Sequence, residues 1–238
     1  MKRLFVIMCL SFVLLLNSTV AYADSPVTST PFYTEYLDVD IVQASEQGTI
    51  NAEIAEYLAD ESNPIDVKAA VINALSWDFN GKDNAEIYSQ LIYGKSINEL
   101  DFINLPGDQQ FCIGYLMAMD DYFDVEQALE YLKIAEENSG NSFTVSIIRA
   151  LVEAMNMEGN IWQKYIEPVL NDSSLNNDLS EDALQIITDY MITYTEESWL
   201  SPKTGVASME FFYGIGAALC ATVVIFGKKT SNSKVTNS

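Results

Sequence analysis

Residues 63–79 read NPIDVKAAVINALSWDF, and their apolar residues recur at the spacing of a single helical face. Asn63 is a residue type that caps helix N-termini, and Pro64 suits a first helical position because it has no backbone N–H to leave unpaired. Four apolar residues fall on one side of such a helix and are expected to face the core: Ile65, Ile72, Leu75 and Phe79. This segment therefore predicts a buried helix with a polar start.

The same chemistry recurs on both sides of this segment. Asn51 precedes a short run that places Ile54, Ala55 and Leu58 on one face. Capping-box spacings, in which a cap residue is followed three positions later by Glu or Gln, occur at Asp83 to Glu86, Ser96 to Glu99, Asp124 to Gln127, and Asp178 to Glu181. The expected helix ends are Gly94, Gly140 and Gly159, and the expected helix breaks are Pro106 and Pro168.

These signals together predict an all-α protein of about seven or eight helices, because no apolar and polar alternation is long enough to indicate a sheet. Gly114 and Tyr115, followed by Ala128, Leu132 and Ala135, loosely resemble the small and aromatic pattern of tetratricopeptide hairpins. Most signature residues of those repeats are absent. The expected architecture is an irregular helical bundle or a short α-solenoid.

The N-terminus has the three parts of a secretory signal peptide. Lys2 and Arg3 are basic, residues 4–16 are apolar, and Ala21-Tyr22-Ala23 matches an A-x-A cleavage site. We expect residues 1–23 to be removed by cleavage between Ala23 and Asp24. Residues 24–48 are interpreted as an N-terminal arm, either flexible or a docking strip that uses its aromatic residues Phe32, Tyr33 and Tyr36. The helical ectodomain is expected over residues 49–200.

The C-terminus combines a short motif, an apolar segment and a basic tail. Ser201-Pro202-Lys203-Thr204-Gly205 precedes a hydrophobic segment at residues 206–227, in which residues 211–227 carry no charge. These 17 uncharged residues would span about 25 Å as a helix, slightly less than a hydrocarbon core. Lysines 228, 229 and 234 follow within the tail at residues 228–238, so the positive-inside rule predicts a cytoplasmic C-terminus and an external ectodomain.

This order of parts resembles the LPxTG-type cell-wall sorting signal of Gram-positive surface proteins. Pro202, Thr204 and Gly205 match the signal, whereas Ser201 replaces its leading Leu. The resemblance implies that a sortase binds the motif transiently, attacks the carbonyl of Thr204, releases the chain from Gly205 onward and joins Thr204 covalently to peptidoglycan. The protein would then be membrane-bound as a precursor and wall-anchored at the cell surface when mature. The alternative is a permanent type I membrane anchor.

Charge restricts the partners of the exported region. Residues 24–204 contain 7 basic and 33 acidic residues, a net charge of −26, which disfavours nucleic acid and anionic lipid as partners. Cys112 is the one cysteine in that range, so no intramolecular disulfide can form there. Its apolar surroundings predict a buried thiol. An internal thioester with Gln109 or Gln110 is a weaker reading, because the other marks of that family are missing.

The absence of histidine removes Ser-His-Asp and Cys-His catalysis and the commonest zinc ligand. Adjacent carboxylates, such as Asp120-Asp121 and Glu136-Glu137, leave open an enzyme that acts on wall glycans. Residues 78–83 and 171–182 are rich in oxygen ligands but do not fit an EF-hand loop, so we interpret both as turns and leave calcium open. We expect a non-enzymatic adhesion or interaction domain, with no cofactor or metal, that binds a host or envelope protein.

Overall fold

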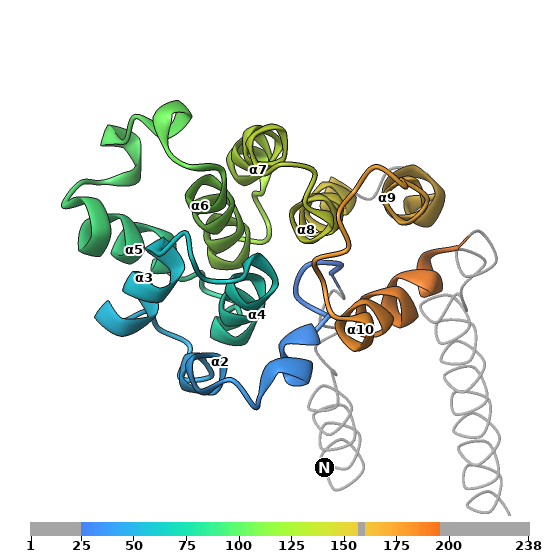
Figure 1. Cartoon of the computed structure of the whole chain (residues 1–238), viewed down its shortest axis with the longest axis horizontal. Coiled ribbons are helices and arrows are strands. Elements are labelled where there is room, and N and C mark those ends of the chain that lie inside the picture. Colours follow the sequence, from blue (N-terminus) through green and yellow to red (C-terminus); the bar gives the residue numbers. More distant parts are fainter. Residues whose placement is uncertain (1–24, 157–159, 196–238) are drawn as a thin grey trace, which may run out of the picture. The chain divides into compact units, whose positions relative to one another are not determined.

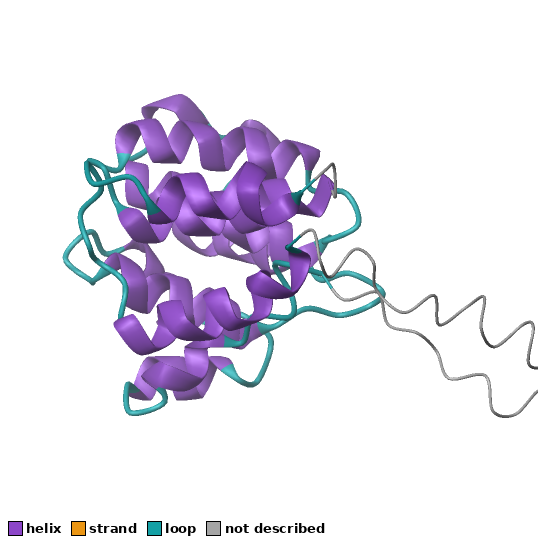
Figure 2. Cartoon of the chain, turned by 90° about the vertical axis from the view of Figure 1, so that its right-hand side faces the viewer, coloured by secondary structure: helices purple, strands orange, loops and turns teal. Residues whose placement is uncertain are grey.

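A computed structural model describes residues 25–156 and 160–195 of the chain. In these ranges there are nine α-helices, and the only β pairing is a single bridge between Ser142 and Asn176 (Figure 2). The helices are α2 (Asp40–Ser45), α3 (Ala52–Ala59), α4 (Ile65–Leu75), α5 (Asn84–Tyr93), α6 (Gly107–Asp120), α7 (Glu126–Asn138), α8 (Phe143–Glu153), α9 (Glu167–Leu170) and α10 (Glu181–Met191). The all-α prediction is confirmed for this part of the chain. The count exceeds the expected seven or eight, because α2 and α9 are too short to show a helical period.

Shorter turns connect or extend these helices. Five are 3-10 turns: η1 (Phe32–Tyr36), η2 (Ile97–Glu99), η3 (Phe102–Asn104), η4 (Ala154–Asn156) and η6 (Ile192–Tyr194). The sixth, η5 (Trp162–Ile166), is a π turn that runs directly into α9. Pro168 was predicted to break a helical run, but it lies in the first turn of α9. Proline has no N–H to donate, and just before it the backbone N–H of Glu167 bonds to the carbonyl of Trp162, which is the wider spacing of a π turn.

The central helix is α4, which residues 63–79 predicted. Its residues from Lys68 to Leu75 are all buried, and it contacts α2, α3, α6, α8 and η1. Figure 1 shows α4 between α2 and the row formed by α6, α7 and α8. Lys68 is fully buried and pairs with Asp108 at the start of α6. A buried cation needs such a partner, so this ion pair fixes α4 against α6.

α6 and α7 form a closely packed hairpin. A Cβ added to Gly114 of α6 would lie 3.0 Å from Cγ of Leu132 on α7, so a larger residue at position 114 would require Leu132 to move away. Arg149 of α8 joins α8 to α7: its Nε donates to Glu136 at 2.9 Å, and its guanidinium also pairs with Glu153. Lys133 of α7 lies 3.6 Å from Glu153. These ion pairs hold α8 against α7 in the row.

The N-terminal segment is part of this domain, which corrects the predicted arm at residues 24–48. Phe32 and Tyr36 of η1 are buried, and η1 contacts α4 and α10. The Tyr36 hydroxyl donates to Asp66 at 3.1 Å and accepts from the Ser180 backbone N–H at 3.1 Å. Tyr33 donates its backbone N–H to Asn73 at 3.1 Å. The sequence was interpreted as an arm because its aromatic residues lie among prolines, but aromatic residues in such a segment can also pack against the core.

Two of the predicted caps are confirmed. The Asn51 side chain accepts from Ile54 N–H at 3.0 Å, and Ser96 and Glu99 form a complete capping box. The other capping-box predictions were wrong: the helices after them begin at Asn84, Glu126 and Glu181 without the predicted bonds. Glu86 accepts from Ser96 and Ile97 instead, and Asp178 accepts from Thr144. Pro64 rather than Asn63 occupies the cap position of α4, and Asn63 instead donates to the carbonyl of Tyr57.

The signal peptide at residues 1–23, the Ala23–Asp24 cleavage site, the motif at residues 201–205, the hydrophobic segment at residues 206–227 and the tail at residues 228–238 lie outside the described residues. Gly159 lies in the gap between the two described ranges. In the residues that the structure does describe, none of the helices has the length and apolar character needed to span a membrane.

Candidate functional site

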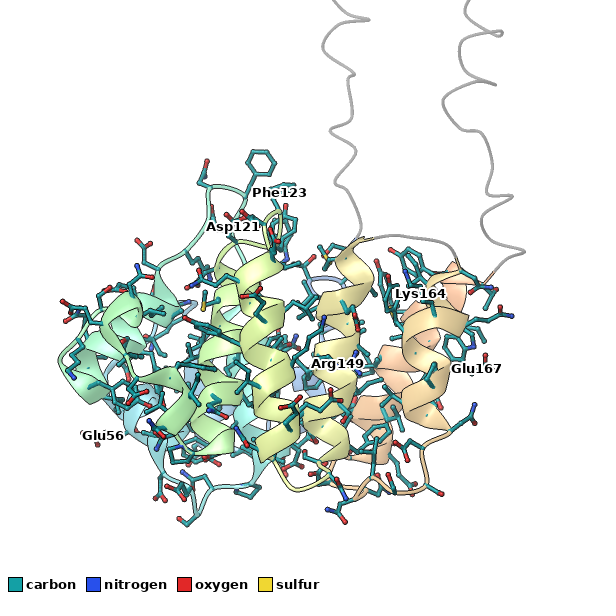
Figure 3. The ribbon with its side chains drawn as sticks, turned by 90° about the horizontal axis from the view of Figure 1, so that it is seen from above. Glu56, Asp121, Phe123, Arg149, Lys164 and Glu167 are labelled. Atoms are coloured by element: carbon teal, nitrogen blue, oxygen red, sulfur yellow. The ribbon has the colours of Figure 1, made fainter. Side chains whose placement is uncertain are left out.

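Two loops meet at one edge of the domain, and we call them the two-loop tip: residues 76–83 between α4 and α5, and residues 121–125 between α6 and α7. Lys82 donates its backbone N–H to the carbonyl of Asp120 at 3.0 Å, which ties the first loop to the end of α6. Gly81 adopts φ +81° where the loops approach each other, a conformation that favours glycine. Figure 3 shows Asp121 and Phe123 at this edge, well away from Arg149.

Aromatic side chains of the two loops pack on each other. Trp77 and Tyr122 meet edge to face with ring centroids 4.9 Å apart, and Tyr122 is buried. Phe79 and Phe123 meet edge to face at 5.8 Å, but their side chains are 65% and 63% exposed. The inner pair anchors the loops, and the outer pair presents apolar surface to solvent.

The exposure of Phe79 corrects a prediction, because the sequence placed it on the buried face of the preceding helix. α4 ends at Leu75, and Ser76 has φ 60°, which breaks the helical period before Phe79. The residues that follow, Asp78-Phe79-Asn80-Gly81, have the composition of a turn. That turn composition was the signal in the sequence that the helix ends before Phe79. Extending the helical period to residue 79 wrongly assigned Phe79 to the buried face.

Aspartates fix the conformation of both loops. Asp78 Oδ1 accepts from the backbone N–H of Asn80 at 2.9 Å and from its side-chain amide at 3.1 Å. These bonds to Asn80 hold the pKa of Asp78 below its usual value, so this exposed carboxylate stays charged. Asp121 Oδ1 accepts from the backbone N–H groups of Phe123 and Asp124 at 3.1 and 3.3 Å. The exposed phenylalanines are therefore carried by ordered turns.

Asp120 lies beneath the two loops and is only 7% exposed. Its Oδ2 accepts from the backbone N–H of Ala85 at 2.7 Å, while its Oδ1 is buried with no hydrogen-bond partner among the described residues. Burial raises the pKa of Asp120 to about 6, against the opposing effect of backbone bonds from Ala85 and Asn84. A buried carboxyl with one unpaired oxygen is costly when ionised, so this residue holds its proton into mildly acidic solution.

Lys82 is the basic residue of the two-loop tip, and its ammonium points away from the exposed acids. Nζ donates to the backbone carbonyls of Gly48 at 2.8 Å and Leu75 at 2.5 Å. Burial lowers the pKa of Lys82, and the nearby Asp120 opposes that effect. The cation thus closes the loop against the domain and leaves the carboxylates of the rim exposed.

Three clefts lie along the two loops, and the first and the third include an exposed phenylalanine ring. The first, of about 260 Å³, is lined by Asp78, Phe79, Asn80 and Gly81 from one loop and by residues 120–123 from the other side. A second, of about 300 Å³, lies over the start of α5 and includes Asp83, Glu86, Asp120 and Asp124. A third, of about 410 Å³, runs from Phe123 to Met155. Aromatic rings and carboxylates therefore share one concave and acidic surface.

The two members of each carboxylate pair singled out in the sequence lie in different environments. Asp120 is buried while Asp121 is exposed, and Glu136 is bound to Arg149 while Glu137 is exposed. Successive positions on a helix point in different directions, which separates the two members of each pair. In the two ranges that the structure describes, no group of three or more Asp, Glu or Cys side chains is placed to hold a metal ion.

The second oxygen-rich segment, residues 171–182, is the loop between α9 and α10 and the start of α10. With residues 139–142 it forms what we call the Ser142 junction, consisting of residues 139–142 and 171–180. Asp178 Oδ1 accepts from the N–H and the hydroxyl of Thr144 at 2.8 and 2.9 Å. Asn176 accepts from the N–H of Phe143 at 3.1 Å, and its side-chain amide donates to the carbonyl of Gly140 at 2.9 Å. These polar groups hold loops together rather than face outward.

Cys112 is fully buried, as predicted, and its Sγ lies 3.7 Å from the carbonyl of Leu58. Burial raises the pKa of this thiol to about 12, so it stays protonated and unreactive at neutral pH. The neighbouring amides are used in packing: Gln110 donates to the carbonyl of Phe102 at 2.8 Å, and Gln109 donates to that of Ala59 at 3.0 Å. These bonds argue against a thioester at this position.

Comparison of the chain with known proteins finds no matching family model, curated protein or solved structure.

Proposed function

We propose that this chain is an exported surface protein that a sortase joins to peptidoglycan through Thr204, and that it displays an acidic helical domain for binding. The observation that carries this proposal is the motif Ser201–Gly205, followed by 17 uncharged residues and then by lysines. A secretory signal at residues 1–23 supports the same route. Each part has a separate physical role, and their order along the chain is the order that wall sorting requires.

The two-loop tip supports the binding half of this proposal. Phe79 and Phe123 are exposed on ordered turns, beside a cleft that carboxylates also line. Exposed aromatic residues on a fixed scaffold are the usual anchors of protein interfaces, because they contribute large contact area at little cost in conformational entropy. A surface protein with this feature is suited to bind a host or envelope protein.

The wall attachment is tested by the mass of the C-terminal peptide. Walls from cells with and without sortase are digested with a muramidase, and the released protein is compared with a Thr204→Ala variant. We expect a peptide that ends at Thr204 and carries a wall-peptide adduct, which is absent without sortase and absent in the variant. An intact tail through Ser238 in the membrane fraction of both strains would instead show a permanent type I membrane protein.

A wall-glycan hydrolase is the second candidate, and Asp120 is the observation that favours it. A carboxyl with a pKa of about 6 beside a cleft lined by aromatic rings has the properties of a general acid, and Asp121 is an exposed carboxylate beside it. The test is the release of reducing ends from purified walls. This candidate requires activity that is lost in Asp120→Asn and kept in Asp101→Asn, and it is rejected if the unaltered protein releases none.

A further inference from the structure

The two-loop tip combines three properties that are not found together elsewhere in the described part of the domain. Its two outer phenylalanines are exposed and touch each other. Its carboxylates line the same cleft of about 260 Å³ as those rings. Its lysine ammonium is turned inward onto backbone carbonyls. The surface that a partner meets is therefore aromatic and negatively charged.

We propose that the two-loop tip binds a basic segment of a partner polypeptide. A guanidinium or ammonium group of that segment lies against the rings of Phe79 and Phe123, where the negative face of an aromatic ring attracts a cation. The carboxylates of Asp78 and Asp121 complete the pairing from the wall of the same cleft. This inference rests on the proposed display role and adds the chemistry of the partner.

The carboxylates retain capacity for such a partner. In Asp78 and Asp121 only Oδ1 accepts hydrogen bonds from the neighbouring turn. Among the described residues, none donates a hydrogen bond to the Oδ2 atom of Asp78 or of Asp121. Each turn thus keeps one carboxylate oxygen available while the other fixes the loop, so a bound cation adds bonds without breaking any.

Charge selects a basic polypeptide over the other occupants of an apolar edge. The exported region carries a net charge of −26, so a second copy of the chain is repelled, and anionic lipid is repelled for the same reason. A neutral glycan can stack on aromatic rings but gains nothing from the negative potential of the rim. A basic segment gains from both features.

The loops are also held in place before binding. The bond from Lys82 N–H to the carbonyl of Asp120 and the packing of Trp77 on Tyr122 fix one loop against the other. Ordering a flexible loop at the moment of binding costs free energy, and a loop that is already ordered avoids most of that cost. A short basic peptide is therefore a sufficient probe.

The test uses the full chain in nonionic detergent and an amidated peptide of alternating arginine and glycine, titrated by calorimetry. We expect the double variant Phe79→Ala and Phe123→Ala to raise Kd about tenfold, because the rings supply the cation–π contact. Asp78→Asn with Asp121→Asn should raise Kd about fivefold at low salt, since asparagine keeps the turn acceptor and loses the charge.

Matched controls separate the tip from the general acidity of the protein. Glu130→Gln with Glu137→Gln removes the same charge from exposed positions on α7, and Ile103→Ala removes an exposed apolar side chain elsewhere. Both should leave Kd within about twofold. Equal weakening by the α7 variant, or no effect of the phenylalanine variant, overturns the proposal.

Two further titrations, with phosphatidylglycerol vesicles and with muramidase-solubilised wall fragments, identify other occupants. The proposal is also overturned if the vesicles or the wall fragments bind in a way that requires Phe79 and Phe123 while the arginine peptide does not bind. A melting curve shows that each variant is folded, which the exposure of both rings leads us to expect. Because these titrations use purified protein, a failure of wall attachment and a failure of peptide binding are read from different experiments.

Discussion

The two-loop tip and the Ser142 junction are both places where two interhelical loops meet, yet they differ in the hydrogen bonding of their polar groups and in the burial of their apolar groups. At the junction, the Asp178 side chain accepts two bonds from Thr144, and Phe143, which follows the junction at the start of α8, is buried. At the tip, Phe79 and Phe123 are exposed, and Asp120 beneath them has a buried oxygen with no hydrogen-bond partner among the described residues. Loops that only join helices normally pair their buried polar groups and cover their apolar ones. The two-loop tip does neither, so it is the better candidate for function.

The largest expected effect is the loss of the buried ring of Phe143, which directly follows the junction at the start of α8. Phe143→Ala should lower the free energy of unfolding by about 3–4 kcal/mol, because it removes core packing and leaves a cavity. Urea unfolding followed by far-ultraviolet circular dichroism measures the change. A loss below about 1 kcal/mol would show that the junction is not packed as described.

The second effect is a pH dependence that comes from Asp120. Its pKa is about 6 in the folded protein against 3.8 for an exposed aspartate, so folding favours the protonated form. The resulting stabilisation, about 2–3 kcal/mol, is complete below about pH 4 and is lost as the pH rises through about 6.

The variant Asp120→Asn isolates the contribution of Asp120 to the pH dependence of stability, because all other carboxylates are the same in the variant and the unaltered protein. The unaltered protein should gain stability relative to the variant as the pH falls from about 7 to about 4. Unfolding free energies at matched pH values measure the difference between the two proteins. A difference that stays constant with pH would remove Asp120 as the cause.

The third effect concerns the polar bonds of the junction. Asp178→Ala should cost about 2 kcal/mol, because it leaves the N–H of the buried Thr144 without an acceptor, while the Thr144 hydroxyl keeps its bond to the backbone carbonyl of residue 178. Asp178→Asn keeps an acceptor and should cost less than half as much by the same unfolding measurement. Equal losses in the two variants would assign the effect to charge rather than to hydrogen bonding.

The smallest effect belongs to the tip. Phe79→Ala and Phe123→Ala should each change the free energy of unfolding by about 0.5 kcal/mol or less, since exposed side chains contribute little to stability. Thermal unfolding of the two tip variants, measured under the same conditions as that of Phe143→Ala, compares their losses of stability. A loss from either tip variant as large as that from Phe143→Ala would place these rings in the core and end their role as a docking surface.

The sequence predicted the helical class and the central helix, because apolar residues recur at helical spacing through Leu75 and Pro64 marks the start of α4. It predicted the caps at Asn51 and Ser96, where the cap bonds are local. The cap predictions failed where the carboxylate accepts hydrogen bonds from a residue outside its own helix. Asp178 accepts from Thr144 instead of capping α10, and Glu86 accepts from Ser96 and Ile97. Local patterns do not show such long-range competition.

The candidate site was harder to predict than the fold. Phe79 was assigned to the core, and nothing in the sequence placed it beside Phe123, 44 positions further along the chain. The adjacent aspartates at positions 120 and 121 were visible, but their separation into one buried and one exposed carboxyl depends on how α6 packs. The proposed sorting motif, in contrast, is inferred from the sequence alone, because a sortase would recognise it as a linear peptide.

The most direct test of the account is amide hydrogen exchange of the full chain with and without the arginine and glycine peptide. We predict added protection in residues 76–83 and 121–125, and no change in residues 139–142 and 171–180. Protection at the Ser142 junction, or protection spread evenly over the acidic helices, would contradict the claim that the two-loop tip is the binding surface.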